Sequence, residues 1–532
     1  KQEVLDNARE ELLIWSKENF EKLSEKDKNL YINAFVVNSG DPAYRSVSSL
    51  KYTNGSNERE VTVPEGDVFH QFRQDVNSGK LPMISWLAPP QNFSDHPSAP
   101  WYGAWYVSEI MDILTKNPEV WKKTIFIATY DENDGYFDHV VPFSISDNKK
   151  PGTGKCSAGI ETEIEHVRIE NEIKQGIPKN QAREAPVGLG FRVPLIVASP
   201  WSRGGKVCSQ VFDHTSTLQF LESFLNKKLN KEFRQENISR WRRTISGDLS
   251  SVFSPYDDRK LPAMPFLNRD QFVEDIYNAK FKDAPSGFKK LTEKEIDEIV
   301  KNSSTSSLFA QQEKGVRPSC ALPYELYADG QIDAGTGRFE MDLVAGNDFF
   351  GKNSAGSPFT VCAPGNFSDE TGTSEVCRNW SFAVAAGDKI GYGWPLDGFE
   401  NKRYHLKLYG PNGFYREFTG DPKDPSLDIN FEYEKDRKSG KPTGNVLLKF
   451  INPDKLGSYI INVSDNAYKT KSLLKEITKN NTSNLLLNLS KSFGWYDFTV
   501  KIKGFDTFEK RYAGRVETGK ESFSDPFMGR MI

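Results

Sequence analysis

Residues 124–139, which read TIFIATYDENDGYFDH, are the stretch that decides the fold of the N-terminal half. Residues 124–130 are mostly apolar without polar alternation, which predicts a strand covered on both faces, as in a parallel sheet. Residues 131–139 hold four carboxylates, one asparagine and one histidine. Because ligands of open α/β sheets bind beyond the carboxyl ends of the strands, the sequence predicts a site directly after a core strand.

The surrounding segments are also typical of an α/β domain. Residues 81–87 and 193–198 form short apolar runs that predict strands, and residues 105–115 and 215–226 have helical spacing of apolar residues. This order of strands and helices favours a mainly parallel sheet within residues 1–260. A polar connector follows at 261–317, with a helix predicted at 292–302.

Residues 318–532 change in character to short alternating runs separated by Gly, Asn and Asp. Residues 339–344 and 404–409 are examples, and this pattern is typical of β-sandwiches. Residues 337–343 and 404–410 are echoed by residues 444–450 and 496–502. The echo predicts two copies of one small β domain, at 318–430 and 431–532.

The composition and charge of the chain argue against nucleic-acid binding and against a membrane-spanning segment. The chain has 532 residues and a formal net charge of −4, and it shows no basic stripe of the kind that nucleic-acid-binding proteins carry. No apolar run approaches the ~18 residues of a membrane span. Of the five cysteines, Cys362 and Cys377 lie close in sequence, and they either pair or remain ordinary thiols.

The four carboxylates within residues 131–139 are candidate ligands for a divalent metal ion. Carboxylate oxygens suit hard cations, and such a cation at a strand end stabilises a transferring phosphoryl group. The alternative is a solvated acidic turn, because Asn133-Asp134-Gly135 is itself turn chemistry.

Three further segments carry candidate functional side chains. His96 is either a proton donor or phosphate partner, or a loop histidine that binds backbone. Trp101 and Tyr102 either form a cage for a quaternary ammonium group or belong to the core. His214 either lines the site or stands beside Asp213 at a helix N-terminus.

Six blocks together resemble the bacterial phosphocholine-specific phospholipases C of the non-haemolytic type, a phosphoesterase family of the alkaline-phosphatase-like superfamily. The resemblance covers nearly the whole chain. The blocks are Tyr130–Val140, Ser94–Pro97 with Tyr102–Tyr106, Arg192–Gly205, Val211–Ser216, Trp241–Leu249 and Arg317–Leu326.

The resemblance implies an α/β alkaline-phosphatase-like core, present in part at 1–260, followed by two small all-β sandwich domains. It implies hydrolysis of phosphatidylcholine, with sphingomyelin as an alternative substrate, to phosphocholine and a lipid alcohol. Asp131 and Glu132 would hold the metal, and His96, Glu132 and His139 would be catalytic. His214, Trp101 and Tyr102 would bind substrate.

The same resemblance implies a secreted or periplasmic bacterial enzyme that meets phospholipid at a membrane surface without a transmembrane segment. Protein partners are not indicated.

One departure from the family pattern concerns the nucleophile. The family carries a Glu-Asn-Arg-Ser block after an opening strand, and residues 1–80 contain no such block. We therefore expect the chain alone to lack its N-terminal nucleophile segment and to be inactive by itself. The alternatives are an acid phosphomonoesterase of the same superfamily and a non-catalytic binding protein on a decayed enzyme core.

Overall fold

The computed structural model describes residues 2–14, 16–34, 36, 38–94, 96, 102–258, 265–308, 313–453 and 457–532. The chain forms two compact units. Unit 1 comprises Lys1–Phe126 and Asp258–Leu291, and unit 2 comprises Ile127–Asp257 and Thr292–Ile532. Within the described residues, no helix combines the length and apolarity needed to cross a bilayer.

Unit 1 consists of helices and one hairpin around an aromatic core. Phe69, Val76, Trp105, Tyr106 and Ile110 are buried together. The predicted helix at 105–115 is confirmed as α5, and Trp105 and Tyr106 are core residues. The elements are α1 (Gln2–Ile14), α2 (Lys17–Glu21), α3 (Glu25–Ala34), β1 (Val47–Asn54), β2 (Asn57–Pro64), α4 (His70–Ser78), η1 (Gln91–Phe93), α5 (Tyr102–Thr115), α6 (Pro118–Trp121) and α10 (Arg269–Ala279).

The strand predicted at 81–87 is wrong, because the structure has irregular chain there. Pro82 offers no amide hydrogen to a ladder. Met83 is 59% exposed and Trp86 is 73% exposed, so this run does not contribute a buried strand. The apolar run is hydrophobic enough for a strand, but no strand of the described part of the chain pairs with it. The sequence of the run alone does not show whether a partner strand exists.

The first part of unit 2 positions the candidate site. β3 (Phe126–Thr129) pairs with β7 (Leu195–Ala198) in a two-stranded sheet, which confirms both predicted strands. α8 (His214–Leu229) confirms the predicted helix, and it begins with a capping box between Asp213 and Ser216. Smaller elements are β4 (Gly154–Cys156), η2 (Glu163–Glu165), β5 (His166–Val167), α7 (Ile169–Lys174), β6 (Ala185–Pro186), α9 (Arg240–Ile245) and η3 (Ser250–Val252).

The connector between the two parts of the chain contains the predicted helix at 292–302. α11 (Glu293–Lys301) follows its N-cap residue Thr292, whose hydroxyl forms a second capping box with Glu295. This reciprocal pair satisfies two backbone donors that would otherwise have no partner, so the helix starts where the sequence predicts. A short 3₁₀ turn, η4 (Ser303–Thr305), follows.

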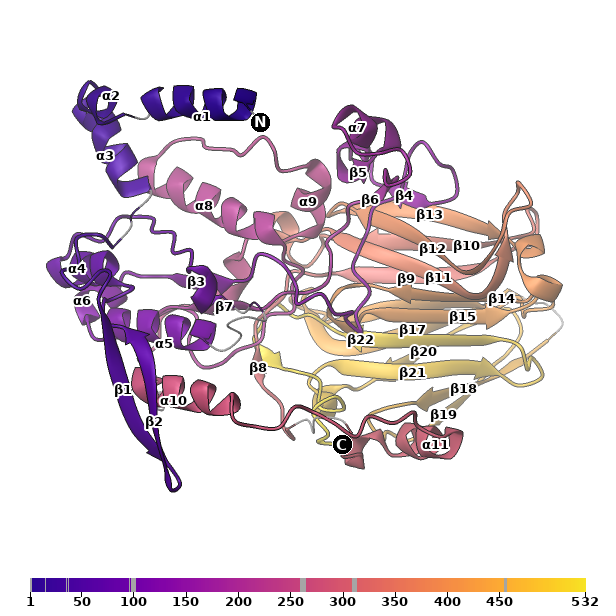
Figure 1. The fold of residues 1–532 in the computed structure, drawn as a ribbon. Coiled ribbons are helices and arrows are strands. Elements are labelled where there is room, and N and C mark those ends of the chain that lie inside the picture. Colours follow the sequence, from indigo (N-terminus) through magenta and orange to yellow (C-terminus); the bar gives the residue numbers. More distant parts are fainter. Residues whose placement is uncertain are drawn as a thin grey trace. The chain divides into compact units, whose positions relative to one another are not determined.

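The rest of unit 2 is a region of long antiparallel strands (Figure 1). Alternation decides which side chains enter the core: in β14 the buried side chains are Tyr404, Leu406 and Leu408. The strands are β8 (Pro318–Ser319), β9 (Leu326–Asp333), β10 (Arg338–Ala345), β11 (Ser357–Ser368), β12 (Ser374–Val384), β13 (Asp388–Pro395), β14 (Tyr404–Tyr409), β15 (Tyr415–Gly420), β16 (Asp428–Lys435), β17 (Pro442–Asn452), β18 (Tyr459–Asp465), β19 (Leu473–Ile477), β20 (Asn481–Leu487), β21 (Trp495–Ile502), β22 (Glu509–Arg515) and β23 (Ser522–Phe523).

The strand pairing repeats between the two segments that echo each other in sequence. β13-β10-β9 corresponds to β20-β17-β16, and β12-β11-β14-β15 corresponds to β19-β18-β21-β22. The two sets of strands join where β15 pairs with β22. One nine-stranded sheet and one large hydrophobic core therefore include strands from both repeats. The predicted boundary near residue 430 stays a prediction.

Unit 2 is held together where the first part meets the β region. β4 adds to β12 as a parallel edge strand, with Cys156 opposite Ala383. Trp241 and Ile245 of α9 share a small core with Ala383. Residues 127–257 therefore supply both a strand and core side chains to the β region.

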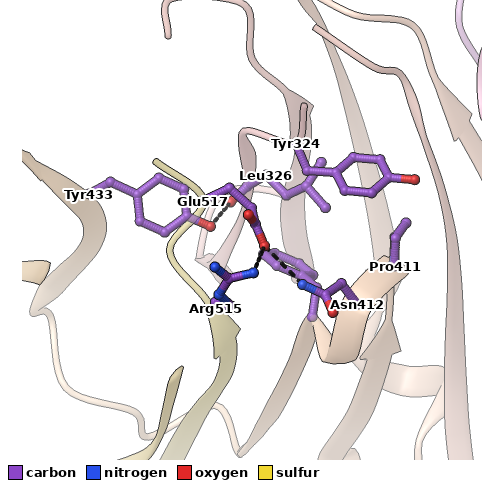
Figure 2. Close-up of a pocket in the computed structure, with 8 residues that line it drawn as sticks. Tyr324, Leu326, Pro411, Asn412, Tyr433, Arg515 and Glu517 are labelled. Atoms are coloured by element: carbon purple, nitrogen blue, oxygen red, sulfur yellow. Dashed lines mark hydrogen bonds and ion pairs between the residues drawn. The ribbon is translucent and has the colours of Figure 1, made fainter. Parts of the chain in front are cut away.

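A buried ion pair lies inside the β region beside a small cavity of about 10 Å³ (Figure 2). Glu517 Oε1 accepts hydrogen bonds from Arg515 Nη1 at 3.1 Å and Asn412 Nδ2 at 2.9 Å. The side chains of Arg515 and Glu517 are each 3% exposed. Burial raises the pKa of Glu517 to about 7, although the Arg515 cation acts in the opposite direction.

Candidate active site

The loop that leaves β3 is shaped by its own polar side chains. Asn133 Nδ2 donates to the carbonyl oxygen of Tyr136 at 3.2 Å, and Asp134 Oδ1 accepts from the Tyr136 amide at 3.0 Å. Gly135 has φ +83°, a left-handed conformation that glycine adopts without strain. Asn133 and Asp134 thus form the turn, as the turn interpretation of this triplet predicts.

Asp131 and Glu132 precede this turn and are both exposed. Asp131 Oδ1 accepts from the Glu132 amide at 3.1 Å, which fixes the start of the loop. Two neighbouring carboxylates offer the oxygen donors that hard divalent cations prefer. Within the described residues, however, no group of three or more His, Cys, Asp or Glu side chains is arranged to hold a metal ion.

Asp138 is occupied by an arginine from a distant part of the sequence. Arg192 Nε and Nη2 donate to its two carboxylate oxygens at 2.6 and 3.0 Å. This bidentate pairing holds the pKa of Asp138 well below its usual range. His139 Nδ1 lies 3.2 Å from Asp138 Oδ1, and its side chain is 85% exposed. Its predicted catalytic role is untested by this geometry.

His214 is brought against the loop by the start of α8. Its Nε2 lies 2.9 Å from the carbonyl oxygen of Tyr130, directly before Asp131. A carbonyl oxygen only accepts, so Nε2 is the donor, and in the neutral ring Nδ1 is left as an acceptor. The structure thus places the predicted His214 next to the segment that carries Asp131 and Glu132.

Arg242 fixes the residue before His214. Its Nη1 donates to Asp213 Oδ2 at 2.8 Å, and its Nε and Nη2 donate to the two oxygens of Glu165 at 3.0 and 2.9 Å. Asp213 Oδ1 accepts from the Thr215 amide at 2.9 Å and caps α8. The predicted cap is confirmed at Asp213, and the functional role of His214 stays a prediction.

The remaining predicted residues belong to unit 1. His96 is exposed and follows η1. Tyr102 begins α5 and is half-buried, with its ring 6.2 Å from that of Phe93, and burial raises the pKa of its hydroxyl. Trp101 lies outside the described residues. The structure brings together the loop of Asp131 with His214, and it leaves His96 and Tyr102 in the other compact unit.

Sequence reasoning gave no role to Arg192 or Arg242, although both bind carboxylates at this site. Their partners Asp138 and Glu165 lie 54 and 77 residues away in the chain. A pairing at such separation leaves no local periodicity to recognise. The available signal was that both arginines lie in segments that resemble the family, Arg192 directly before a predicted strand and Arg242 beside Trp241.

Comparisons with known proteins find two family models that match parts of this chain. Residues 15–226 match the model of the phosphoesterase family, and residues 318–421 match that of the bacterial phospholipase C C-terminal domain. The chain is 34% identical over 466 residues to a non-hemolytic phospholipase C of Burkholderia pseudomallei, covering 87% of this chain. It is 33% identical over 482 residues to a hemolytic phospholipase C of Pseudomonas aeruginosa, covering 86% of this chain.

The match extends to more distant relatives. A non-specific phospholipase C6 of Arabidopsis thaliana is 24% identical over 305 residues, which cover 51% of this chain and 52% of the relative. The chain spans 59% of the length of each of the two bacterial relatives. The site loop and the start of α8 both lie within the phosphoesterase match.

Proposed function

We propose that the complete protein is a phospholipase C, because residues 15–226 match the phosphoesterase family and residues 318–421 match the C-terminal domain of bacterial phospholipases C. Its proposed reaction is hydrolysis of phosphatidylcholine to phosphocholine and diacylglycerol, with sphingomyelin as an alternative substrate. The observation that carries the proposal is the His214–Tyr130 contact, because Tyr130 directly precedes Asp131 and Glu132 in the loop after β3.

A divalent metal ion is part of this proposal. Asp131 and Glu132 are two of its ligands, with further donors outside the described set of this chain. Such an ion supplies charge stabilisation to the phosphoryl oxygens when bound. Side chains supply the other functions. Nδ1 of His214 accepts a proton or a hydrogen bond at the site, and Arg242 holds the N-terminus of α8 in place through Asp213.

The roles of the other candidates follow from the family resemblance. We propose that His96 protonates the leaving lipid alcohol, that His139 assists proton transfer, and that Tyr102 and Trp101 contact the choline group. The finer fold belongs to the same proposal: an alkaline-phosphatase-like core followed by two β-sandwich domains. The substrate would be met at a membrane surface by an exported protein.

The test is paired substitution in the full-length protein. We expect Asp131→Ala with Glu132→Ala to lower kcat/KM on phosphatidylcholine by on the order of 10²-fold or more, as losses of transition-state charge stabilisers do. Removal of metal by a chelator should lower activity similarly, and added divalent cation should restore it only where both carboxylates are present. A control pair on the same unit, Glu161→Ala with Glu236→Ala, should retain turnover.

Substrate comparison separates the proposal from its alternatives. A phospholipase C should turn over a choline phosphodiester faster than a simple phosphomonoester, whereas an acid phosphatase should do the reverse. Absence of turnover on both substrates by the metal-loaded full-length protein would favour a binding protein. Unchanged turnover in the Asp131/Glu132 pair would refute the assigned ligands.

A further inference from the structure

Four of the five cysteines stand in two close pairs. All five are unpaired thiols in the structure. The Sγ atoms of Cys362 and Cys377 are 3.4 Å apart. Cys208 and Cys320 are neighbours across a short pairing of two chain segments. The fifth, Cys156, instead contacts the Ser146 hydroxyl at 3.4 Å.

The Cys208–Cys320 pair is set by backbone geometry. Val207 and Ser319 form a parallel bridge, the Cys320 amide donates to the Val207 carbonyl at 2.9 Å, and the Val207 amide donates to the Pro318 carbonyl at 2.9 Å. In a parallel register the next residues, Cys208 and Cys320, are opposite and share a face. Paired strands lie about 4.8 Å apart, within the Cα separation that a disulfide spans.

The contact between the two thiols of this pair shifts their pKa values in opposite directions. The contact with Cys320 lowers the pKa of Cys208 to about 7, and the same contact with burial raises the pKa of Cys320. A thiolate beside a thiol is the arrangement from which disulfide exchange proceeds. Cys208 Sγ also lies 3.3 Å from Ser251 Oγ, whose hydroxyl donates to Gln210 Oε1.

The Cys362–Cys377 pair bridges two neighbouring strands. Cys362 is opposite Asn379, so Cys377 lies two positions along β12 on the same face. The register shifts between Ala363 and Asn366, and Cys377 has φ +58°, an uncommon conformation for a residue other than glycine. This irregularity turns the exposed Cys377 towards Cys362.

We propose that Cys208–Cys320 and Cys362–Cys377 form a framework of two disulfides, with Cys156 remaining a free thiol. In each step a small-molecule disulfide such as oxidised glutathione takes two electrons from the cysteine pair. One protein disulfide forms, the oxidant's S–S bond breaks, and two glutathione thiols carry away the two protons. The first link joins the phosphoesterase part of the chain to the C-terminal region, five residues before the α8 cap Asp213.

The test counts thiols on the whole folded chain. The protein is equilibrated in a buffer of reduced and oxidised glutathione, quenched in acid, denatured and alkylated, and its intact mass is measured. We expect one alkyl group per chain, on Cys156, and five after prior reduction. Peptide mapping without reduction should recover Cys208 joined to Cys320 and Cys362 joined to Cys377.

Single variants provide matched controls. Cys156→Ser should leave no alkylated cysteine, while Cys320→Ser should leave two, Cys156 and Cys208. The same mapping on the unsubstituted chain remains decisive if a variant fails to fold. Recovery of Cys208 or Cys320 in alkylated form at equilibrium would overturn the first link, and recovery of Cys362 or Cys377 would overturn the second. Pairing of any of the four with Cys156 would overturn the framework.

Discussion

At the scale of single residues, the buried carboxylate of Glu517 makes stability depend on pH. Its pKa is raised to about 7 from 4.5 by burial. Folded protein therefore holds a proton that unfolded protein releases in this interval, so the free energy of unfolding falls as pH rises from about 4.5 to about 7. At 1.36 kcal/mol per pKa unit the loss reaches about 3 kcal/mol.

We predict that Glu517→Gln, which resembles the protonated side chain, removes this part of the pH dependence. Urea unfolding at about pH 5 and about pH 8 should show a smaller difference for the variant than for the unsubstituted protein. Glu432→Gln, on the exposed side of β16, should preserve the original difference. An equal difference in unfolding free energy between the two pH values in all three proteins would contradict the assignment of this titration to Glu517.

Residues near the site show what local sequence can predict. The motif of Asp213 and His214 was recognisable because a cap and its helix are contiguous. Arg242 was not, because its role depends on Glu165 and Asp213 being brought together by folding. The role of His96 stays a prediction for a related reason, since its unit is separate from that of Asp131.

At the scale of elements, the N-terminus of α8 depends on Asp213 in two ways. Asp213 caps the helix and accepts from Arg242 Nη1, so its loss removes the acceptor of a backbone amide and one of the hydrogen bonds of a half-buried guanidinium that still contacts Glu165. We predict that Asp213→Ala lowers the free energy of unfolding by about 1–2 kcal/mol from the cap alone, and by more through Arg242.

Comparison with a simpler cap separates the two effects in urea unfolding. Asn268 caps α10 by accepting from the Gln271 amide, and among the described contacts its side chain binds no arginine. Asn268→Ala should therefore lower the free energy of unfolding by less than Asp213→Ala does. Asp213→Asn should recover the capping part, because asparagine also accepts from the helix amides. An Asp213→Ala cost no larger than that of Asn268→Ala would argue against a stabilising role for Arg242.

The edge strand β4 depends on a glycine. Gly154 has φ +122°, and a Cβ there would lie 1.9 Å from the carbonyl oxygen of Ser381. We predict that Gly154→Ala displaces β4 from β12 and destabilises unit 2 by at least about 1–3 kcal/mol, the usual cost of forced backbone strain. Amide exchange at residues 381–383 should accelerate, whereas Gly365→Ala, where a Cβ meets nothing within 4 Å, should leave it unchanged.

Elements with a strong period were predictable, and elements made by distant partners were not. Residues 404–409 alternate cleanly, and β14 occupies the same residues. β4 spans three residues in a turn-rich segment and exists only because β12 receives it. The mistaken strand at 81–87 is the converse case, an apolar run for which the fold supplies no partner.

At the scale of the whole molecule, unit 2 should unfold cooperatively across its two chain segments. Trp241 and Ile245 share a core with Ala383, and the Ser157 amide donates to the Ala383 carbonyl at 2.9 Å. We predict that α9 and β12 lose amide protection at the same denaturant concentration in native-state hydrogen exchange. Helix α5, in unit 1, is the internal reference. Earlier loss of protection in α9 would show that the segments open separately.

The repeated β architecture was visible in sequence, but its junction was not. The echo between residues 404–410 and 496–502 indicated equivalent strands, and β14 and β21 indeed occupy corresponding places. The pairing of Tyr415 with Ala513, which joins the two sets of strands, connects strands that are nearly a hundred residues apart. Sequence periodicity carries no information about such a register.

The parallel pairing of β4 with β12 also limits how the C-terminal region can be exchanged between genes. A gene rearrangement that carried residues 318–532 to another enzyme would leave behind the strand that covers the outer edge of β12. The transplanted sheet would expose unpaired amide and carbonyl groups, which invite association with other chains. We therefore expect residues 154–156 and the C-terminal region to be inherited together, even though more than 160 residues separate them in the sequence.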